Sequence, residues 1–186
     1  MSWYCEAADG HPFRGPYHDC EYGYPIDDEA VLFERLSLEI FQAGLSWLIV
    51  LKKRPTTFTA FDGFDVDRVA AYNARDIERL LSDTGIIRNR RKVDAIVENG
   101  KRIQALRASH GGFNKWIGAN HPRELAEWVK LFRATFVFMG SEVVNEFLMS
   151  TGYLPGAHHP DCPIFKKIAK LAPPWMQAQK PPKPEK

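Results

Sequence analysis

Residues 80 to 92 read Leu80-Leu81-Ser82-Asp83-Thr84-Gly85-Ile86-Ile87-Arg88-Asn89-Arg90-Arg91-Lys92, an order that predicts a helix, a glycine-containing hairpin and a second helix. Four cations in five positions open the second helix, where free backbone N–H groups add to the positive charge. The hairpin thus suits a nucleic-acid phosphate, which Gly85, Ile86, Ile87, Arg88 and Arg90 would contact. The alternative is a solvated basic face, although two isoleucines are unusual in an exposed loop.

Helical periodicity extends on both sides of this hairpin, with apolar residues three and four apart from Asp27 to Leu171. Asp27, Ser46, Asp65 and Asn73 are expected to cap helices, and Pro55 is expected to end one of them. The expected helices are 27–43, 47–51, 65–69, 73–81, 88–107, 122–132, 141–151 and a short one after residue 163. Strand-like alternation is scarce, so the predicted fold class is all-α.

The bulk composition indicates one domain. The chain has 186 residues, 45% of them hydrophobic, which suffices for one core. We expect a single helical domain over residues 1–172 and a disordered, proline- and lysine-rich tail over residues 173–186. The formal net charge is only +2, so nucleic-acid binding would depend on a local basic patch.

The sequence also bears on the compartment. No run of residues has the apolar length that a bilayer requires, and the first residues lack the character of a signal peptide. We therefore expect a cytoplasmic protein with no membrane partner. The three cysteines make an odd count, which fits thiols that serve as metal ligands better than a disulfide.

Four soft ligands lie at the two ends of the chain. Cys5 and His18 are separated by a long predicted loop, whereas His158 and Cys162 have a spacing that suits one helical turn or a tight loop. Together they form a Cys2His2 set for one structural zinc ion, which would join the N- and C-terminal segments. His159 or Cys20 could each replace a neighbour in this set. A catalytic zinc is an alternative, but it needs an open coordination position.

A carboxylate lies on a predicted buried face. Glu39 shares a helical stripe with Leu32, Leu36 and Ala43. Burying an unpaired charge costs roughly several kcal/mol, so such a group is usually hydrogen-bonded, ion-paired or placed to meet a ligand. From this helix alone, two interpretations are equally compatible: Glu39 forms a structural ion pair with an arginine, or it contacts a ligand.

Three aromatic residues favour the ligand. Tyr17 and Tyr22 flank the proposed zinc ligand His18, and Trp47 follows Glu39 across a glycine. Zinc binding would hold the loop around His18 against the helix that carries Glu39. Each ring alone is more simply a core residue, but a carboxylate within an aromatic box suits a flat, cationic ligand that donates hydrogen bonds.

Three segments carry a resemblance to a known family. They are Tyr17-His18-Asp19-Cys20-Glu21-Tyr22-Gly23-Tyr24-Pro25, Leu38-Glu39-Ile40-Phe41-Gln42-Ala43-Gly44-Leu45-Ser46-Trp47 and Gly85-Ile86-Ile87-Arg88-Asn89-Arg90. They closely resemble, in the same order, those of 3-methyladenine DNA glycosylase I, the bacterial Tag family. The resemblance is looser in the C-terminal third, and Tyr22 stands where the family usually has tryptophan.

This resemblance implies a helix-hairpin-helix DNA glycosylase fold with one structural zinc ion. It matches the base-reading carboxylate to Glu39, the stacking aromatics to Tyr17 and Trp47, and the zinc ligands to Cys5, His18, His158 and Cys162.

The implied activity is removal of 3-methyladenine from alkylated double-stranded DNA by a monomeric enzyme. The leaving base is already cationic, so extrusion and selection of the base are the main tasks. Glu39 would accept hydrogen bonds from the exocyclic amino group and stabilise cationic character. No lysine stands out as a Schiff-base nucleophile, which predicts hydrolysis without strand cleavage. The alternative is a DNA-binding zinc protein of the same fold that is non-catalytic or has altered specificity.

Overall fold

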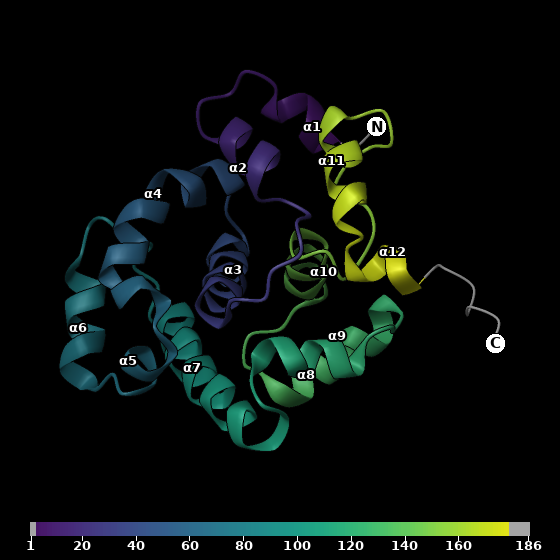
Figure 1. The fold of residues 1–186 in the computed structure, drawn as a ribbon. Helices are drawn as coiled ribbons and strands as arrows, with labels where there is room; N and C mark the ends of the chain where they lie inside the picture. The colour runs from purple at the N-terminus through teal and green to yellow at the C-terminus, as the bar shows by residue number, and fades with distance from the viewer. Residues whose placement is uncertain (1–2, 179–186) are drawn as a thin grey trace.

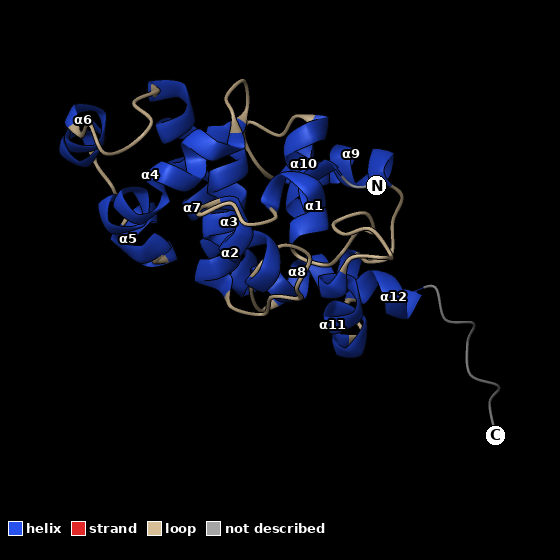
Figure 2. Ribbon diagram, turned by 90° about the horizontal axis from the view of Figure 1, so that it is seen from above, coloured by secondary structure: helices blue, strands red, loops and turns tan. Residues whose placement is uncertain are grey.

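The computed structural model describes residues 3–178, and this part of the chain contains only helices, turns and loops (Figure 2). The predicted all-α class is confirmed. The elements are α1 (Trp3–Ala8), α2 (Arg14–Cys20), α3 (Glu29–Gln42), α4 (Trp47–Ala60), the 3-10 turn η1 (Asp62–Phe64), α5 (Val66–Ala70), α6 (Ala74–Ser82), α7 (Arg90–His110), α8 (Phe113–Asn120), α9 (Leu125–Thr135), α10 (Ser141–Ser150), α11 (Pro163–Leu171) and α12 (Pro174–Ala178). None of these helices is long and apolar enough to cross a membrane.

Helix α3 is the centre of the molecule. It contacts α4, α5, α7, α8 and α10, and in Figure 1 it lies beside α10 in the middle of the ring formed by the other helices. Every residue from Leu32 to Phe41 is buried, so α3 is enclosed on all sides and not along one stripe only. Polar side chains on α3 therefore need partners inside the protein or in a cavity.

The two ends of the described chain meet on one side of the fold. Figure 1 shows α1 and α2 next to α11, although more than a hundred residues separate them in sequence. No helix–helix packing as extensive as that around α3 holds these segments together. A separate small apolar cluster of Cys162, Ile164 and Ile168 lies here, with Cys5 packed against it.

Two predicted helix caps are confirmed and one is corrected. Asp65 accepts a hydrogen bond from the backbone N–H of Arg68, and Asn73 forms a capping box with Asp76. At α3 the cap is Asp28 and not Asp27, because the Asp28 carboxylate accepts from the N–H three residues later at 3.0 Å.

Two further helix starts differ from the prediction. Ser46 precedes α4 as predicted, but its side chain makes no capping hydrogen bond. Helix α7 begins at Arg90, after the cap Asn89, and not at Arg88. Arg88 therefore belongs to the hairpin and not to the helix.

The prediction that Pro55 ends a short helix is wrong, because α4 continues to Ala60. A proline inside a helix removes one backbone hydrogen bond, and tertiary contacts can offset that loss. Here Arg54 is held by carboxylates of neighbouring segments, and the Thr57 hydroxyl donates to the carbonyl of Lys53 at 2.8 Å. Ion pairs distant in sequence and a local side-chain hydrogen bond thus support α4 on both sides of Pro55.

Several short helices escaped prediction. Helix α2 lies in the segment expected to be a loop and contains both Gly15 and Pro16, whereas α1 and α8 lie in segments for which no helix was predicted. Residues 174–178, expected to belong to the disordered tail, form α12, where the N–H of Trp175 donates to the carbonyl of Gly152. The remainder of the predicted tail, residues 179–186, lies outside the described part of the chain.

Candidate functional site: a carboxylate pocket beside a Cys2His2 cluster

A cavity of about 600 Å³ lies between α3, α10, the start of α4 and the N-terminal helices. Leu45 and Glu142, both exposed, mark its mouth. Half of its lining residues are aromatic or acidic, and the complete lining is Tyr4, Tyr17, Tyr22, Glu39, Gln42, Ala43, Gly44, Leu45, Trp47, Glu142, Val143, Glu146, Met149 and Gly156. The cavity therefore contains the predicted Glu39, Tyr17, Tyr22 and Trp47 in one place.

Glu39 is the most unusual group in this cavity. Its side chain projects from the buried helix α3, and the residue is 4% exposed. Within residues 3–178 its carboxylate makes no hydrogen bond or ion pair. Burial raises the pKa of Glu39 well above its usual value, and the negative charge of Glu146 raises it further, while Arg35 only partly opposes this shift. A buried carboxylate that faces a cavity without a partner is suited to receive one from a ligand.

Aromatic rings form the walls around this carboxylate. The ring centroid of Tyr17 lies 5.1 Å from that of Trp47 and 5.7 Å from that of Tyr22. Tyr4, which the sequence did not single out, adds a fourth ring at 5.1 Å from Tyr22, and its hydroxyl accepts a hydrogen bond from the Trp47 indole at 3.2 Å. Burial raises the pKa of Tyr4 to about 12, so its hydroxyl stays protonated. The aromatic walls are thus uncharged, and the only charged groups that the described residues contribute to the lining are carboxylates.

Helix α10 contributes the acidic residues that the sequence reasoning missed. Glu146 faces the cavity, and the Tyr22 hydroxyl donates to its Oε2 at 3.1 Å. The available signal was its position three residues after Val143 and one before Phe147, both buried apolar residues on the same helix. Compared with the tryptophan usual in the resembled family, Tyr22 keeps an aromatic ring and adds a hydroxyl, which donates to Glu146.

A network of ion pairs lies behind the aromatic wall. Arg54 binds both carboxylate oxygens of Glu21 and of Glu34 at 2.8 to 3.0 Å, and Arg35 pairs with Glu21. The guanidinium of Arg35 lies 4.6 Å from the ring centroid of Tyr17. Burial opposes ionisation of Glu21, but its hydrogen bonds from Arg54 and the nearby Arg35 hold the pKa of Glu21 below its usual value. The network fixes Tyr17 from the side away from the cavity.

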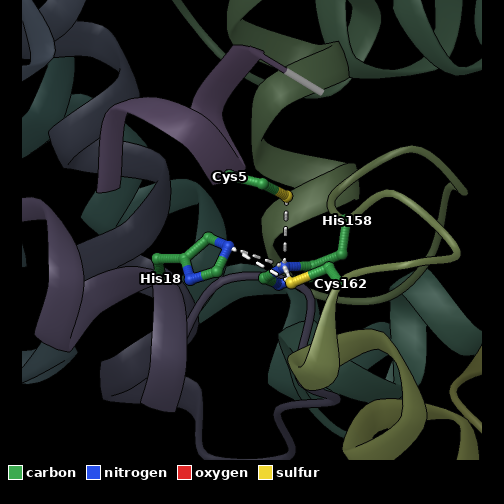
Figure 3. Close-up of side chains that lie close together, drawn as sticks. All are labelled: Cys5, His18, His158 and Cys162. Carbon is green, nitrogen blue, oxygen red and sulfur yellow. Dashed lines mark hydrogen bonds between the residues drawn. The ribbon is translucent and has the colours of Figure 1, made fainter. Parts of the chain in front are cut away.

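The four predicted metal ligands come together. Figure 3 shows Cys5 from α1, His18 from α2, His158 from the loop before α11 and Cys162 at the start of α11, with their side chains pointing toward one another. Their ligand atoms all lie within 4.8 Å of one another. His18 thus lies on a helix and not in the long loop that was predicted.

The distances between four pairs of these atoms are close to the edges of a tetrahedral site. Usual zinc–sulfur and zinc–nitrogen bonds give tetrahedral edges of about 3.3 to 3.8 Å. Cys162 Sγ lies 3.7 Å from both His18 Nε2 and His158 Nδ1, these two nitrogens are 3.1 Å apart, and Cys5 Sγ is 3.9 Å from His158 Nδ1. The donor set of two thiols and two imidazoles is complete without water.

Neighbouring groups orient both imidazoles. His18 Nδ1 lies 2.7 Å from a carboxylate oxygen of Asp19, and His158 Nε2 lies 2.6 Å from the carbonyl oxygen of Tyr22. Such contacts leave the other ring nitrogen available to a metal. Because Tyr22 also lines the cavity, the cluster and the pocket are directly connected. The alternatives His159, which contacts Asp161, and the exposed Cys20 are not part of the cluster.

The hairpin after α6 is held in shape by its own side chains. Gly85 donates its N–H to the Asp83 carboxylate at 2.7 Å, and its carbonyl accepts from Thr56 at 2.6 Å. A Cβ at Gly85 would lie 2.9 Å from the Asp83 carboxylate and 3.1 Å from Thr56 Cβ, so a larger residue would displace these side chains. Ile86 is buried and anchors the hairpin in the core, whereas Ile87 is half-buried. Gly85 therefore shapes the hairpin, and in this structure its N–H donates to Asp83.

The hairpin cations divide into three kinds. Arg88 and Arg91 are exposed and make no ion pair with any residue from 3 to 178, whereas Arg90 pairs with Glu78. Lys92, counted from the sequence among the surface cations, is buried, and its ammonium donates to the carbonyls of Phe41 and Ala43 at 2.8 and 2.6 Å. That prediction is corrected: Lys92 joins the start of α7 to the rim of the pocket.

A helix-hairpin-helix beside an aromatic pocket with a buried carboxylate places the protein in the class of helix-hairpin-helix DNA glycosylases. Within this class, the sequence assigns the chain to one family. A family model for methyladenine glycosylases matches residues 7–128, and the chain belongs to this family. The part after residue 128, which lies outside that match, supplies Glu146, His158 and Cys162.

Named relatives agree with this assignment. The chain is 36% identical over 166 residues to DNA-3-methyladenine glycosylase of Haemophilus influenzae, covering 79% of this chain and 89% of that protein. It is 35% identical over 151 residues to DNA-3-methyladenine glycosylase 1 of Escherichia coli, covering 80% and 81%. Among solved structures, 3-methyladenine DNA glycosylase I from Staphylococcus aureus, in a study of 3-methyladenine recognition, superposes with a TM-score of 0.77 at 31% identity, covering 88% of this chain and 96% of that one.

Proposed function

We propose that this protein hydrolyses the N-glycosidic bond of 3-methyladenine in alkylated double-stranded DNA and releases the free base. The observation that carries the proposal is Glu39, a buried carboxylate inside an aromatic cavity that has no partner among residues 3–178. Relatives named for this activity and a glycosylase structure in complex with 3-methyladenine support the choice of base.

The chemistry follows from the charge of the lesion. A 3-methylated adenine is already cationic in the nucleotide, so its bond to the sugar breaks without a strong general acid. The base must first leave the helix, which costs roughly a few kcal/mol, and stacking on aromatic rings returns about 1 to 3 kcal/mol. Tyr17 and Trp47 are placed for that stacking, and Glu39 would accept hydrogen bonds from the exocyclic amino group. Water then attacks the cationic sugar carbon.

The hairpin and the cavity mouth are suited to hold the DNA. Arg88, Arg91 and the first N–H groups of α7 would contact a phosphate without reading sequence. Leu45, an apolar side chain that is 40% exposed at the mouth, is placed to fill the space left by the extruded base. Lys92 would transmit the position of the hairpin to this rim.

The proposed reaction stops at base release, and a monomer suffices for it. No lysine lines the cavity within the described residues, so no amine is at hand for a Schiff base with the sugar. Every residue proposed for binding or catalysis comes from one chain. We therefore expect abasic DNA as the product, without strand cleavage.

Cys5, His18, His158 and Cys162 would hold one structural zinc ion. A bound ion would supply cross-linking of the two terminal segments and no chemistry to the substrate, since four protein ligands leave no open position. The expected result is one zinc per chain, with spectroscopy showing two sulfur and two nitrogen ligands. Chelation should lower the unfolding temperature together with base release. A metal-bound water, or full activity after complete metal removal, would contradict this role.

The direct test of the activity measures free 3-methyladenine released from methylated duplex DNA. The intact protein should release the base, and Glu39→Gln should release far less while still binding DNA. Absence of release by the intact, metal-replete protein would refute the proposal. Salt-sensitive DNA binding that weakens on Arg88→Gln, without release of any base, would instead support a DNA-binding protein of the same fold.

A further inference from the structure

The cavity holds a second carboxylate with an unused oxygen. Glu146 on α10 accepts a hydrogen bond at Oε2 from the Tyr22 hydroxyl, 3.1 Å away. Its other oxygen, Oε1, makes no hydrogen bond with any residue from 3 to 178. The side chain lines the same cavity as Glu39, which comes from the neighbouring helix α3. Two helices that pack together thus each present a carboxylate to one space.

No cation within the described chain balances this pair from inside the cavity. Neither lysine nor arginine is among the residues that line it, and Arg35 lies behind Tyr17. Like charges in a half-buried space disfavour each other, which is why Glu146 raises the pKa of Glu39. Such an arrangement is stabilised when a cation enters. The electrostatics of the cavity therefore favour a positively charged occupant over a neutral one of the same shape.

The Tyr22 hydroxyl fixes the direction of the Glu146 carboxylate. The backbone of Tyr22 is itself fixed, since its carbonyl contacts His158 and its ring packs on Tyr4 and Tyr17. A donor on Oε2 leaves Oε1 as the carboxylate oxygen available to a ligand. The carboxylate is thus held in one orientation before any ligand binds, which reduces the entropic cost of using it.

We propose that Glu146 is a second base-recognition residue, a carboxylate held by Tyr22 that selects a cationic purine over a neutral one. This inference rests on the proposed function, because it assigns Glu146 to the same pocket. Glu39 and Glu146 would then contact the extruded base from two walls, between the stacking rings. Selection by charge separates an alkylated purine nucleotide, which carries a positive charge, from an undamaged one, which does not.

Binding of two small probes tests this role without the chemical step. The cationic probe is 3,9-dimethyladeninium, in which a methyl group replaces the sugar, and the neutral probe is free 3-methyladenine at pH 8. Affinities are measured by calorimetry for the wild type, Glu146→Gln, Tyr22→Phe and Glu142→Gln. Glu142 is the matched control, because it carries the same charge one turn earlier on α10, at the exposed mouth.

Glu146→Gln should weaken binding of the cationic probe about 10- to 100-fold, the usual loss of a hydrogen bond to a charged group. The neutral probe should change less than about threefold, since glutamine keeps the size and one acceptor oxygen. Tyr22→Phe should weaken the cation by a smaller factor, and Glu142→Gln by no more than about threefold because water screens an exposed charge. Unfolding curves of each variant report whether the pocket remains folded.

Three results would overturn the inference: equal affinity of wild type and Glu146→Gln for the cation, equal losses for both probes, or an equal loss in Glu142→Gln. Absence of cation binding by the wild type would also overturn it. If the wild type releases 3-methyladenine but Glu146→Gln keeps full cation selectivity, the inference fails while the proposed function stands. If the cation binds through Glu146 but no base is released, the proposed activity fails while the role of Glu146 stands.

Discussion

Two carboxylates on one helix are equally buried but differ in their partners. Glu34 and Glu39 both lie on α3 and are 5% and 4% exposed. Glu34 receives two hydrogen bonds from Arg54 at 2.8 and 3.0 Å, whereas Glu39 has no partner within residues 3–178 and faces a cavity. Burial of a carboxylate therefore does not mark a functional site by itself. The absence of a partner does mark such a site. An unpaired buried carboxylate destabilises the free protein, and a ligand that pairs with it removes this cost.

The largest expected difference between them is in activity. Glu39→Gln should lower the single-turnover rate of 3-methyladenine release roughly 10²- to 10³-fold, because it removes the charge aimed at the departing base. Glu34→Gln, assayed where it remains folded, should stay within about fivefold of the wild type, since Glu34 lies outside the cavity. Equal losses in both variants would break the contrast between the two carboxylates.

For stability the order of the two variants should be reversed, with the larger loss in Glu34→Gln. Glu34→Gln should lower the free energy of unfolding by about 2 kcal/mol, because Arg54 loses one of its two carboxylate partners in a mostly buried network. Glu39→Gln should not destabilise the fold at neutral pH. Urea unfolding at pH 7 measures both changes, and a Glu39 variant as unstable as the Glu34 variant would contradict an unpartnered Glu39.

The stability effect of Glu39→Gln should grow with pH. The pKa of Glu39 is raised in the folded protein, so its contribution to stability is complete at low pH, below the ordinary carboxyl pKa, and is lost as the pH rises through the raised value. The variant should therefore match the wild type near pH 4 and exceed it near pH 8, by on the order of 1 kcal/mol for each unit of pKa difference. Parallel stability curves across this range would argue against a raised pKa.

The smallest expected effect concerns Arg35, which contacts both the ion-pair network and the aromatic wall of the cavity. It pairs with Glu21, and its positive charge partly offsets the raised pKa of Glu39. The other groups that line the cavity with Glu39 are Glu146 from α10 and the hydroxyl-bearing rings of Tyr4, Tyr17 and Tyr22. Arg35→Met should move the acidic limb of the pH–rate profile to higher pH, because Glu39 then ionises less readily. An unchanged or downward shift would show that Arg35 does not act on Glu39.

The sequence predicted much of this site because its chemistry is local. Helical spacing placed Glu39 on a buried face, and the types and positions of Cys5, His18, His158 and Cys162 indicated a metal cluster that the fold assembles. It could not exclude an arginine partner for Glu39, because ion pairing depends on which helices meet. Arg54 of α4 reaches Glu34 and Glu21, and no arginine of the described chain lines the cavity.

Other residues were missed or misassigned for the same reason. Glu146 and Tyr4 lie far from Glu39 in sequence, and only the packing of α10 and α1 brings them into the cavity. Lys92 looked like one of four surface cations, yet it turns inward to the carbonyls of Phe41 and Ala43.

The sequence by itself determined the helical class, the candidate ligands of a metal site and the candidate carboxylate, since periodicity and ligand chemistry are carried by residue types along the chain. The tertiary structure alone decided which buried charges have partners, that His158 and not His159 completes the cluster, and that Glu146 shares the pocket with Glu39. The physical reason is that hydrogen bonds and ion pairs act over a few ångströms, between atoms that only packing of distant segments brings together.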